Sequence, residues 1–199
     1  MKSNVCKIEK GSKDLAAILR ESEKVAVYNE LTHKQTLQLR LLCEEMDGML
    51  PNIIDEFDGD LWFEVENGVC QIKISLELSS FTADKKEKLI ALAKDRKNAA
   101  AVGIVGKIRS AIEDFFLDEE NAQLMVASAD TFHLSTGYSE GVDYAYLWSL
   151  EQYRNSVKKE TASEAWDELE KSVIASVADD VVVGVKGKRA DIIIIKSFA

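Results

Sequence analysis

The sequence predicts a two-layer α+β sandwich, in which a mixed, largely antiparallel sheet is covered on one face by helices. Three observations lead to this fold class. Apolar and polar residues alternate on both sides of Asn67-Gly68, a dipeptide that favours the tight turn of a β-hairpin. β-Branched residues fill much of 181–195, which is typical of a second, buried hairpin. Residues 34–57 and 103–116 carry apolar side chains at helical spacing, and an apolar sheet face requires such helices to cover it.

The N-terminal third predicts a strand and two helices. Residues 4–9 alternate weakly and suit a short strand, and a helical pattern then extends from residue 12 or 14 to about residue 31. Thr32 and Gln35 have the spacing of a capping box, in which each side chain bonds the backbone amide of the other residue. We therefore expect a second helix to begin directly after Thr32.

This second helix is predicted to cover residues 34–57. Its apolar stripe consists of Leu39, Leu42, Cys43, Met46, Leu50, Ile53 and Phe57. Pro51 lacks an amide hydrogen and clashes with the preceding turn, so we expect it to kink or split the helix near Gly48.

The remaining elements are predicted from changes in the spacing of apolar residues along the chain. The first hairpin is predicted from strands at 61–66 and 69–78, and helical periodicity returns at 82–94 and 103–116. A short strand is expected at 124–127.

Two further helices are expected at about 143–158 and 163–177, before the terminal hairpin with strands at 181–185 and 192–195. Without repeats or low-complexity linkers, residues 1–199 are predicted to form one domain.

Composition limits the classes of function. The chain has 199 residues and a net charge of -10, and its apolar runs fall short of the roughly 18 residues of a membrane helix. Its first residues lack an apolar signal core, so we expect a cytoplasmic protein with no membrane partner. A pI near 4.8 argues against nucleic-acid binding, which depends on clustered cations. The three cysteines lack metal-ligand spacing and predict no metal site: Cys6, Cys43 and Cys70.

A candidate phosphate site lies at the start of the helix of residues 103–116. Gly103 and Gly106 permit close backbone approach, and the free N–H groups of a helix N-terminus attract anions. Lys107 follows them, and Lys97-Asn98 stands just upstream, within a basic run of residues 85–109. The alternative interpretation is that these glycines only allow the helix to pack tightly against the sheet.

The order of elements resembles the ATP-binding domain of the GHKL superfamily, which has a Bergerat or histidine-kinase-like ATPase fold. The small anti-sigma-factor serine kinases are the most similar members. Three segments carry the resemblance: residues 39–46 (LRLLCEEM), residues 61–78 and residues 103–114 (GIVGKIRSAIED). They are similar to the helix with the family's acidic residue, the central hairpin and the second glycine box. Residues 118–165 have no counterpart and would form an insertion.

The resemblance implies what the site would do. Glu45 would act as general base, and Lys97, Asn98, Gly103, Gly106 and Lys107 would contact ATP. The implied activity is that of a serine/threonine kinase or an ATPase. A sigma factor or an anti-sigma antagonist would be the protein partner, and monomer and homodimer both remain open.

The residues also depart from the family pattern. The position of the family's magnesium-binding asparagine is occupied by Met49 or Gly48, neither of which offers a side-chain oxygen to Mg²⁺. Residues 77–81 (ELSSF) lack the aspartate and glycines of the adenine-binding box. A second hypothesis is therefore a non-catalytic interaction module that retains only the fold. A third is an unrelated α/β enzyme that uses the basic run on a phosphorylated small molecule.

Overall fold

The computed structural model describes residues 1–10, 15–54, 57–77, 103–117, 146–157, 172–186 and 189–198. It confirms the α+β class. Six strands form one sheet in the order β1-β2-β3-β6-β5-β4, and every pairing between them is antiparallel, so the sheet is not mixed. The strands are β1 (Cys6–Glu9), β2 (Asp58–Glu66), β3 (Val69–Glu77), β4 (Tyr146–Ser149), β5 (Asp180–Lys186) and β6 (Arg189–Ser197). The described helices are α1 (Leu15–Tyr28), α2 (His33–Ile53), α4 (Gly103–Leu117), α6 (Leu150–Val157) and α8 (Val173–Val177).

The central hairpin forms where the sequence predicts it. Asn67 has φ 49° and Gly68 has φ 77°, the left-handed conformations that a two-residue turn of this type requires. The turn fixes the register, which places Leu61 opposite Ile74 and Phe63 opposite Ile72. These apolar pairs therefore lie on one face of the sheet, and the polar residues between them lie on the other.

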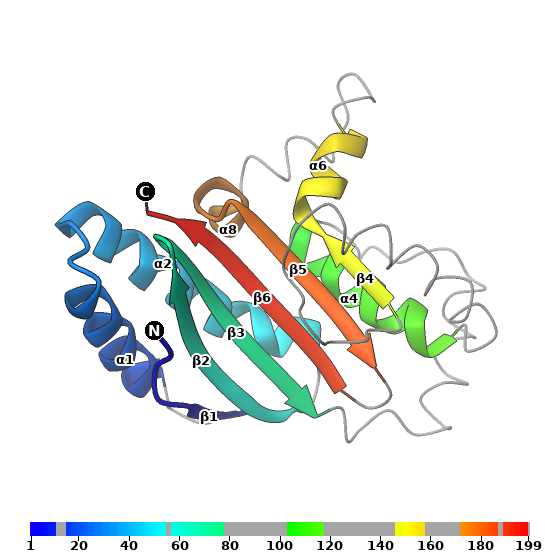
Figure 1. Cartoon of the computed structure of the whole chain (residues 1–199). Helices are drawn as coiled ribbons and strands as arrows, with labels where there is room; N and C mark the ends of the chain where they lie inside the picture. The colour runs from blue at the N-terminus through cyan, green and yellow to red at the C-terminus, as the bar shows by residue number, and fades with distance from the viewer. Residues whose placement is uncertain are drawn as a thin grey trace.

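Helices cover the apolar face, as predicted. Helices α1, α2 and α4 lie behind the sheet in Figure 1, and α2 packs against both α1 and α4. The buried sheet residues on this face are Leu61, Phe63, Cys70, Ile72, Ile74, Leu76, Val181, Val183, Val185, Ala190, Ile192 and Ile194. They meet helix residues that include Ile18, Val25, Leu39, Leu42, Met46, Ile104, Ile108 and Ile112 in one hydrophobic core.

The capping box at the start of α2 is confirmed. The Gln35 amide donates to Thr32 Oγ1 at 3.4 Å, and the Thr32 amide donates to Gln35 Oε1 at 2.8 Å. The Gln35 side chain also donates to the Phe198 carbonyl at 2.8 Å, which joins the start of α2 to the end of β6.

The expected split at Pro51 is wrong, and the alternative, a kink, stays a prediction. Helix α2 is continuous through Pro51 and ends at Ile53, four residues earlier than the expected Phe57. Pro51 removes only the one bond that its amide would have donated to the carbonyl four residues earlier, and the helix ends two residues after it. Buried side chains, among them Leu50 and Ile53, also hold this turn on the core.

The helix expected at 143–158 begins later than predicted. Residues 146–149 form strand β4, which pairs with β5, and the helix α6 begins only at Leu150. Two side chains cap this boundary. Ser149 Oγ accepts a hydrogen bond from the Gln152 amide at 3.2 Å, and Oδ1 of Asp180, at the start of β5, accepts one from the Glu151 amide at 2.9 Å. Ser149 is a local signal for the start of the helix, whereas Asp180 lies far along the chain and is not revealed by local periodicity.

Several other expectations concern residues outside the described ranges. The helix at 82–94 and the strand at 124–127 lie outside them. Of the helix expected at 163–177, only Val173–Val177 is described, as α8 with Ser172 as its N-cap. Of the expected insertion at 118–165, residues 146–157 are described and belong to the same sheet and core.

Candidate functional site

The candidate phosphate site lies where α4 begins. Gly103 has φ 77°, a conformation that favours glycine, and it is half-buried, whereas Gly106 one turn later is buried. The apolar side of this helix is anchored by Ile104, Ile108 and Ile112, all of which are buried. The core therefore fixes the direction of α4, and the amides of its first turn lack helical acceptors. Such a terminus can attract an anion through its free N–H groups and its dipole.

Lys107 has a partner outside its own helix. Its Nζ lies 5.5 Å from the ring centroid of Tyr153 on α6, a cation–π distance, and its side chain is half-buried. Lys97 and Asn98, the other expected phosphate contacts, lie outside the described residues. The structure thus places three of the five expected nucleotide-binding residues on α4: Gly103, Gly106 and Lys107.

Glu45, the expected general base, lies on α2, the helix that packs against α4. The guanidinium of Arg109 on α4 donates to the Asn52 backbone carbonyl at 3.5 Å, so the C-terminal end of α2 lies next to α4. Glu45 is half-buried and has no hydrogen bond or ion pair within the described ranges.

Its neighbour Glu44 is engaged elsewhere. Arg40 Nε donates to Glu44 Oε1 at 3.0 Å, one turn earlier on the same helix. Of the two glutamates, Glu45 is therefore the one whose carboxylate remains available to a ligand.

The resemblance assigns the metal ligand to the position of Met49 or Gly48. Met49 is only 4% exposed and belongs to the hydrophobic core. The nearby Asn52 donates through its side-chain nitrogen to the Gly48 carbonyl at 3.1 Å, which holds this side chain along α2. Among the described residues no group of three histidine, cysteine, aspartate or glutamate side chains could hold a metal ion.

The two buried cysteines offer no nucleophile. Burial raises the pKa of Cys70 to about 12 and raises that of Cys43 further above its ordinary value. Both thiols lie in the apolar core, where they pack as small hydrophobic side chains.

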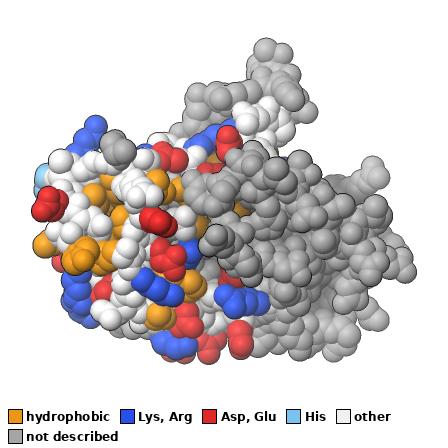
Figure 2. Space-filling model, viewed as in Figure 1, with side chains coloured by type: hydrophobic (Ala, Val, Ile, Leu, Met, Phe, Trp, Pro, Cys, Tyr) orange, Lys and Arg blue, Asp and Glu red, His pale blue; other side chains and the backbone are white. Residues whose placement is uncertain are grey.

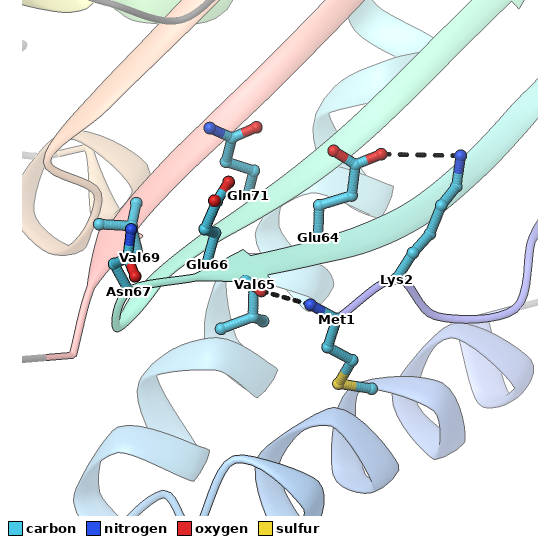
Figure 3. A pocket seen from close by; sticks show the side chains of 8 residues that line it. All are labelled: Met1, Lys2, Glu64, Val65, Glu66, Asn67, Val69 and Gln71. Carbon is cyan, nitrogen blue, oxygen red and sulfur yellow. Dashed lines mark hydrogen bonds and ion pairs between the residues drawn. The ribbon is translucent and has the colours of Figure 1, made fainter.

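A second feature, which sequence reasoning missed, lies on the opposite face of the sheet. Acidic and basic side chains stand side by side over β1–β3 in Figure 2. At the turn end of the β2–β3 hairpin they border an open pocket of about 540 Å³, shown in Figure 3. We call it the hairpin pocket; its lining residues are Met1, Lys2, Glu64, Val65, Glu66, Asn67, Val69 and Gln71.

Comparison of the chain with protein-family models, with curated proteins and with solved structures gives no match. None of the helices in the described ranges is long and apolar enough to cross a membrane.

Proposed function

We propose that the protein is a cytoplasmic regulator with a histidine-kinase-like ATPase fold, similar to the anti-sigma-factor serine kinases, which binds ATP weakly and without Mg²⁺. One observation carries the proposal. Helices α2 and α4 pack side by side behind one antiparallel sheet, and α4 begins at a glycine with positive φ. This arrangement brings the expected acidic side chain and the expected phosphate-binding helix terminus to neighbouring helices.

The residues suggest how a nucleotide would be held. The amides of the first turn of α4 would donate hydrogen bonds to the phosphate oxygens, and Lys107 would supply a positive charge from the next turn. Glu45 lies on the adjacent helix and would face a hydroxyl or a water at the terminal phosphate. Metal ions normally neutralise the charge that develops during phosphoryl transfer, so we expect binding without rapid turnover.

The buried Met49 favours a second function, a non-catalytic interaction module. With that side chain in the core, the chain keeps the framework of an ATPase-like domain without its metal ligand. The partner would be a protein of the sigma-factor or anti-sigma-antagonist type, or a second copy of the chain. We expect no nucleic-acid partner, because a protein of net charge -10 repels the phosphate backbone.

Isothermal titration with ATP and with ADP, each with and without Mg²⁺, tests the proposal. We expect a Kd for ATP weaker than about 100 μM that changes little with Mg²⁺. Lys107→Gln should weaken ATP binding severalfold, whereas Lys34→Gln, at an exposed lysine on α2, should not.

A third variant tests whether Gly106 is needed for ATP binding or only for the packing of α4. Gly106→Val should abolish ATP binding while the far-UV spectrum stays native. If the folded Gly106→Val and Lys107→Gln proteins bind ATP like the parent, the start of α4 is not the site. If ATP and ADP do not bind at all, the interaction module is the better description. Tight, Mg²⁺-dependent binding would overturn the placement of the metal ligand at Met49.

A further inference from the structure

We propose that the hairpin pocket binds the arginine side chain of a partner polypeptide. Glu64, Glu66, Val69 and Gln71 line the pocket from the sheet face opposite to the helices, so the proposal does not depend on nucleotide binding at α4. It rests on the directions of the lining side chains, on the distribution of their charges and on the spacing of their unused hydrogen-bonding groups.

The hairpin register places the polar lining on one face. Glu64 stands opposite Gln71, and Glu66 stands opposite Val69. Because alternate residues of a strand share a face, these four side chains lie together on the face away from the helices. In Figure 3, Glu64, Glu66 and Gln71 point to the same side of the hairpin, whereas Val65 points to the other.

The two glutamates of the pocket differ in their partners. Glu64 accepts a hydrogen bond from the Trp62 indole at 2.8 Å and forms an ion pair with Lys73 at 2.5 Å. Lys2 adds a further ion pair at 3.6 Å. These contacts lower the pKa of Glu64 below its ordinary value, against the opposing effect of burial, and they offset its charge.

The charge of Glu66 is not offset by ion pairs of this kind with described residues. Its side chain is exposed and makes no hydrogen bond or ion pair with any other described residue. The side-chain amides of Asn67 and Gln71 are likewise free of such contacts within the described ranges. Among the described residues, the pocket therefore presents one carboxylate and two side-chain amides without partners, beside the half-buried Val69.

The positive charge at the rim is already engaged. The described lining holds two cations. Lys2 Nζ pairs with Glu64 and lies 5.0 Å from the centroid of the Trp62 ring, and the Met1 ammonium donates to the Val65 carbonyl at 2.6 Å. An incoming anion would have to displace these contacts and approach Glu66. A cation meets an uncompensated carboxylate instead, and the net charge of -10 favours its approach.

Guanidinium fits this lining better than ammonium. Glu66 and Gln71 are diagonal neighbours across the hairpin, a separation of roughly 7–8 Å between backbones that a long side chain can bridge. A planar guanidinium can donate two bonds to the Glu66 carboxylate and another to the Gln71 side-chain oxygen, while its methylenes lie on Val69. The compact ammonium of lysine lacks this fork.

Nuclear magnetic resonance titration of the full chain with N-acetyl-arginine amide tests the proposal. We expect saturable shifts confined to the amides of residues 66–71, with a Kd of roughly 1–10 mM for this single side chain. N-acetyl-citrulline amide, which has nearly the same shape without the charge, should give no saturable shift.

Two matched variants locate the contact. Glu66→Gln should weaken binding of the arginine probe at least about fivefold, because it removes the charged acceptor. Glu77→Gln removes the same charge at the other end of β3, on the same face and about 27 Å away, and should leave the affinity unchanged. Neither substitution touches the core, since both side chains are exposed.

The opposite results would overturn the proposal. These are the absence of saturable shifts up to about 50 mM, equal binding of the citrulline probe, or equal weakening by Glu66→Gln and Glu77→Gln. The last result would show that the arginine probe responds only to the net charge of the chain.

Discussion

Replacing Gly48 with alanine should stabilise the protein. Gly48 is exposed near the C-terminal end of α2 and has no positive φ, and a Cβ built on it meets nothing within 4 Å. The new methyl group therefore meets no obstacle, while the unfolded chain loses the conformational freedom of glycine. Gly-to-Ala changes in exposed helix interiors contribute about 0.8–1 kcal/mol, and we expect a Tm increase of roughly 2–4 °C for a chain of this length.

Gly59→Ala is the matched control, and it should lower the free energy of unfolding where Gly48→Ala raises it. A Cβ at Gly59 would lie 2.3 Å from the Ser75 carbonyl oxygen and 2.9 Å from Leu76 Cδ2, so the β2–β3 pair would have to move apart. We expect a loss of about 1–3 kcal/mol, as for other overpacked sites. Urea denaturation of both variants, with unchanged m-values, measures the difference. Destabilisation by Gly48→Ala, or a neutral Gly59→Ala, would refute this account of the two glycines.

Two further predictions concern titratable groups. The hydrogen bond from Lys24 lowers the pKa of the buried Glu21, so its stabilising effect is complete above its ordinary pKa of 4.5 and is lost as the pH falls through the lower, folded value. The free energy of unfolding of Glu21→Gln, measured in urea across acid pH, should therefore fall less steeply than that of the parent; parallel curves would contradict this. Because burial raises the pKa of Cys70 to about 12, iodoacetamide should label the half-exposed Cys6 of the native protein first, as read by peptide mass spectrometry. Equally fast labelling of Cys70 would show that the core around it opens readily.

The parts of the fold that could be predicted depend on short-range signals. Asn67-Gly68 fixes the hairpin because the turn itself requires positive φ at both positions. Thr32 and Gln35 fix the start of α2 because both partners of the capping box lie within one turn. Helix α4 is predictable because its apolar period continues over several turns.

The wrong predictions concern residues whose structure is decided by distant neighbours. Residues 146–149 form a strand because β5 offers an open edge, and α6 begins where it does because the local Ser149 and the distant Asp180 both cap it. Pro51 remains inside α2 because core contacts hold the last turn. For β4 and for Pro51, tertiary contacts outweigh the local propensity.

The polar face of the hairpin pocket can be predicted once the pairing register of β2 and β3 is known. Once Asn67-Gly68 is accepted as the turn, simple counting pairs Glu66 with Val69 and Glu64 with Gln71. The polar face could therefore have been derived from the sequence. The register also explains why the two glutamates differ, because Lys73 stands diagonally next to Glu64 but four residues along the strand from Val69, the partner of Glu66. At about 3.4 Å per residue, that separation is beyond the reach of a lysine side chain, so Glu66 has no counter-charge among the described residues. Lys73→Met would leave Glu64 with Lys2 as its cationic partner, and we would then expect the arginine probe to bind more tightly, because the pocket would carry one positive charge fewer.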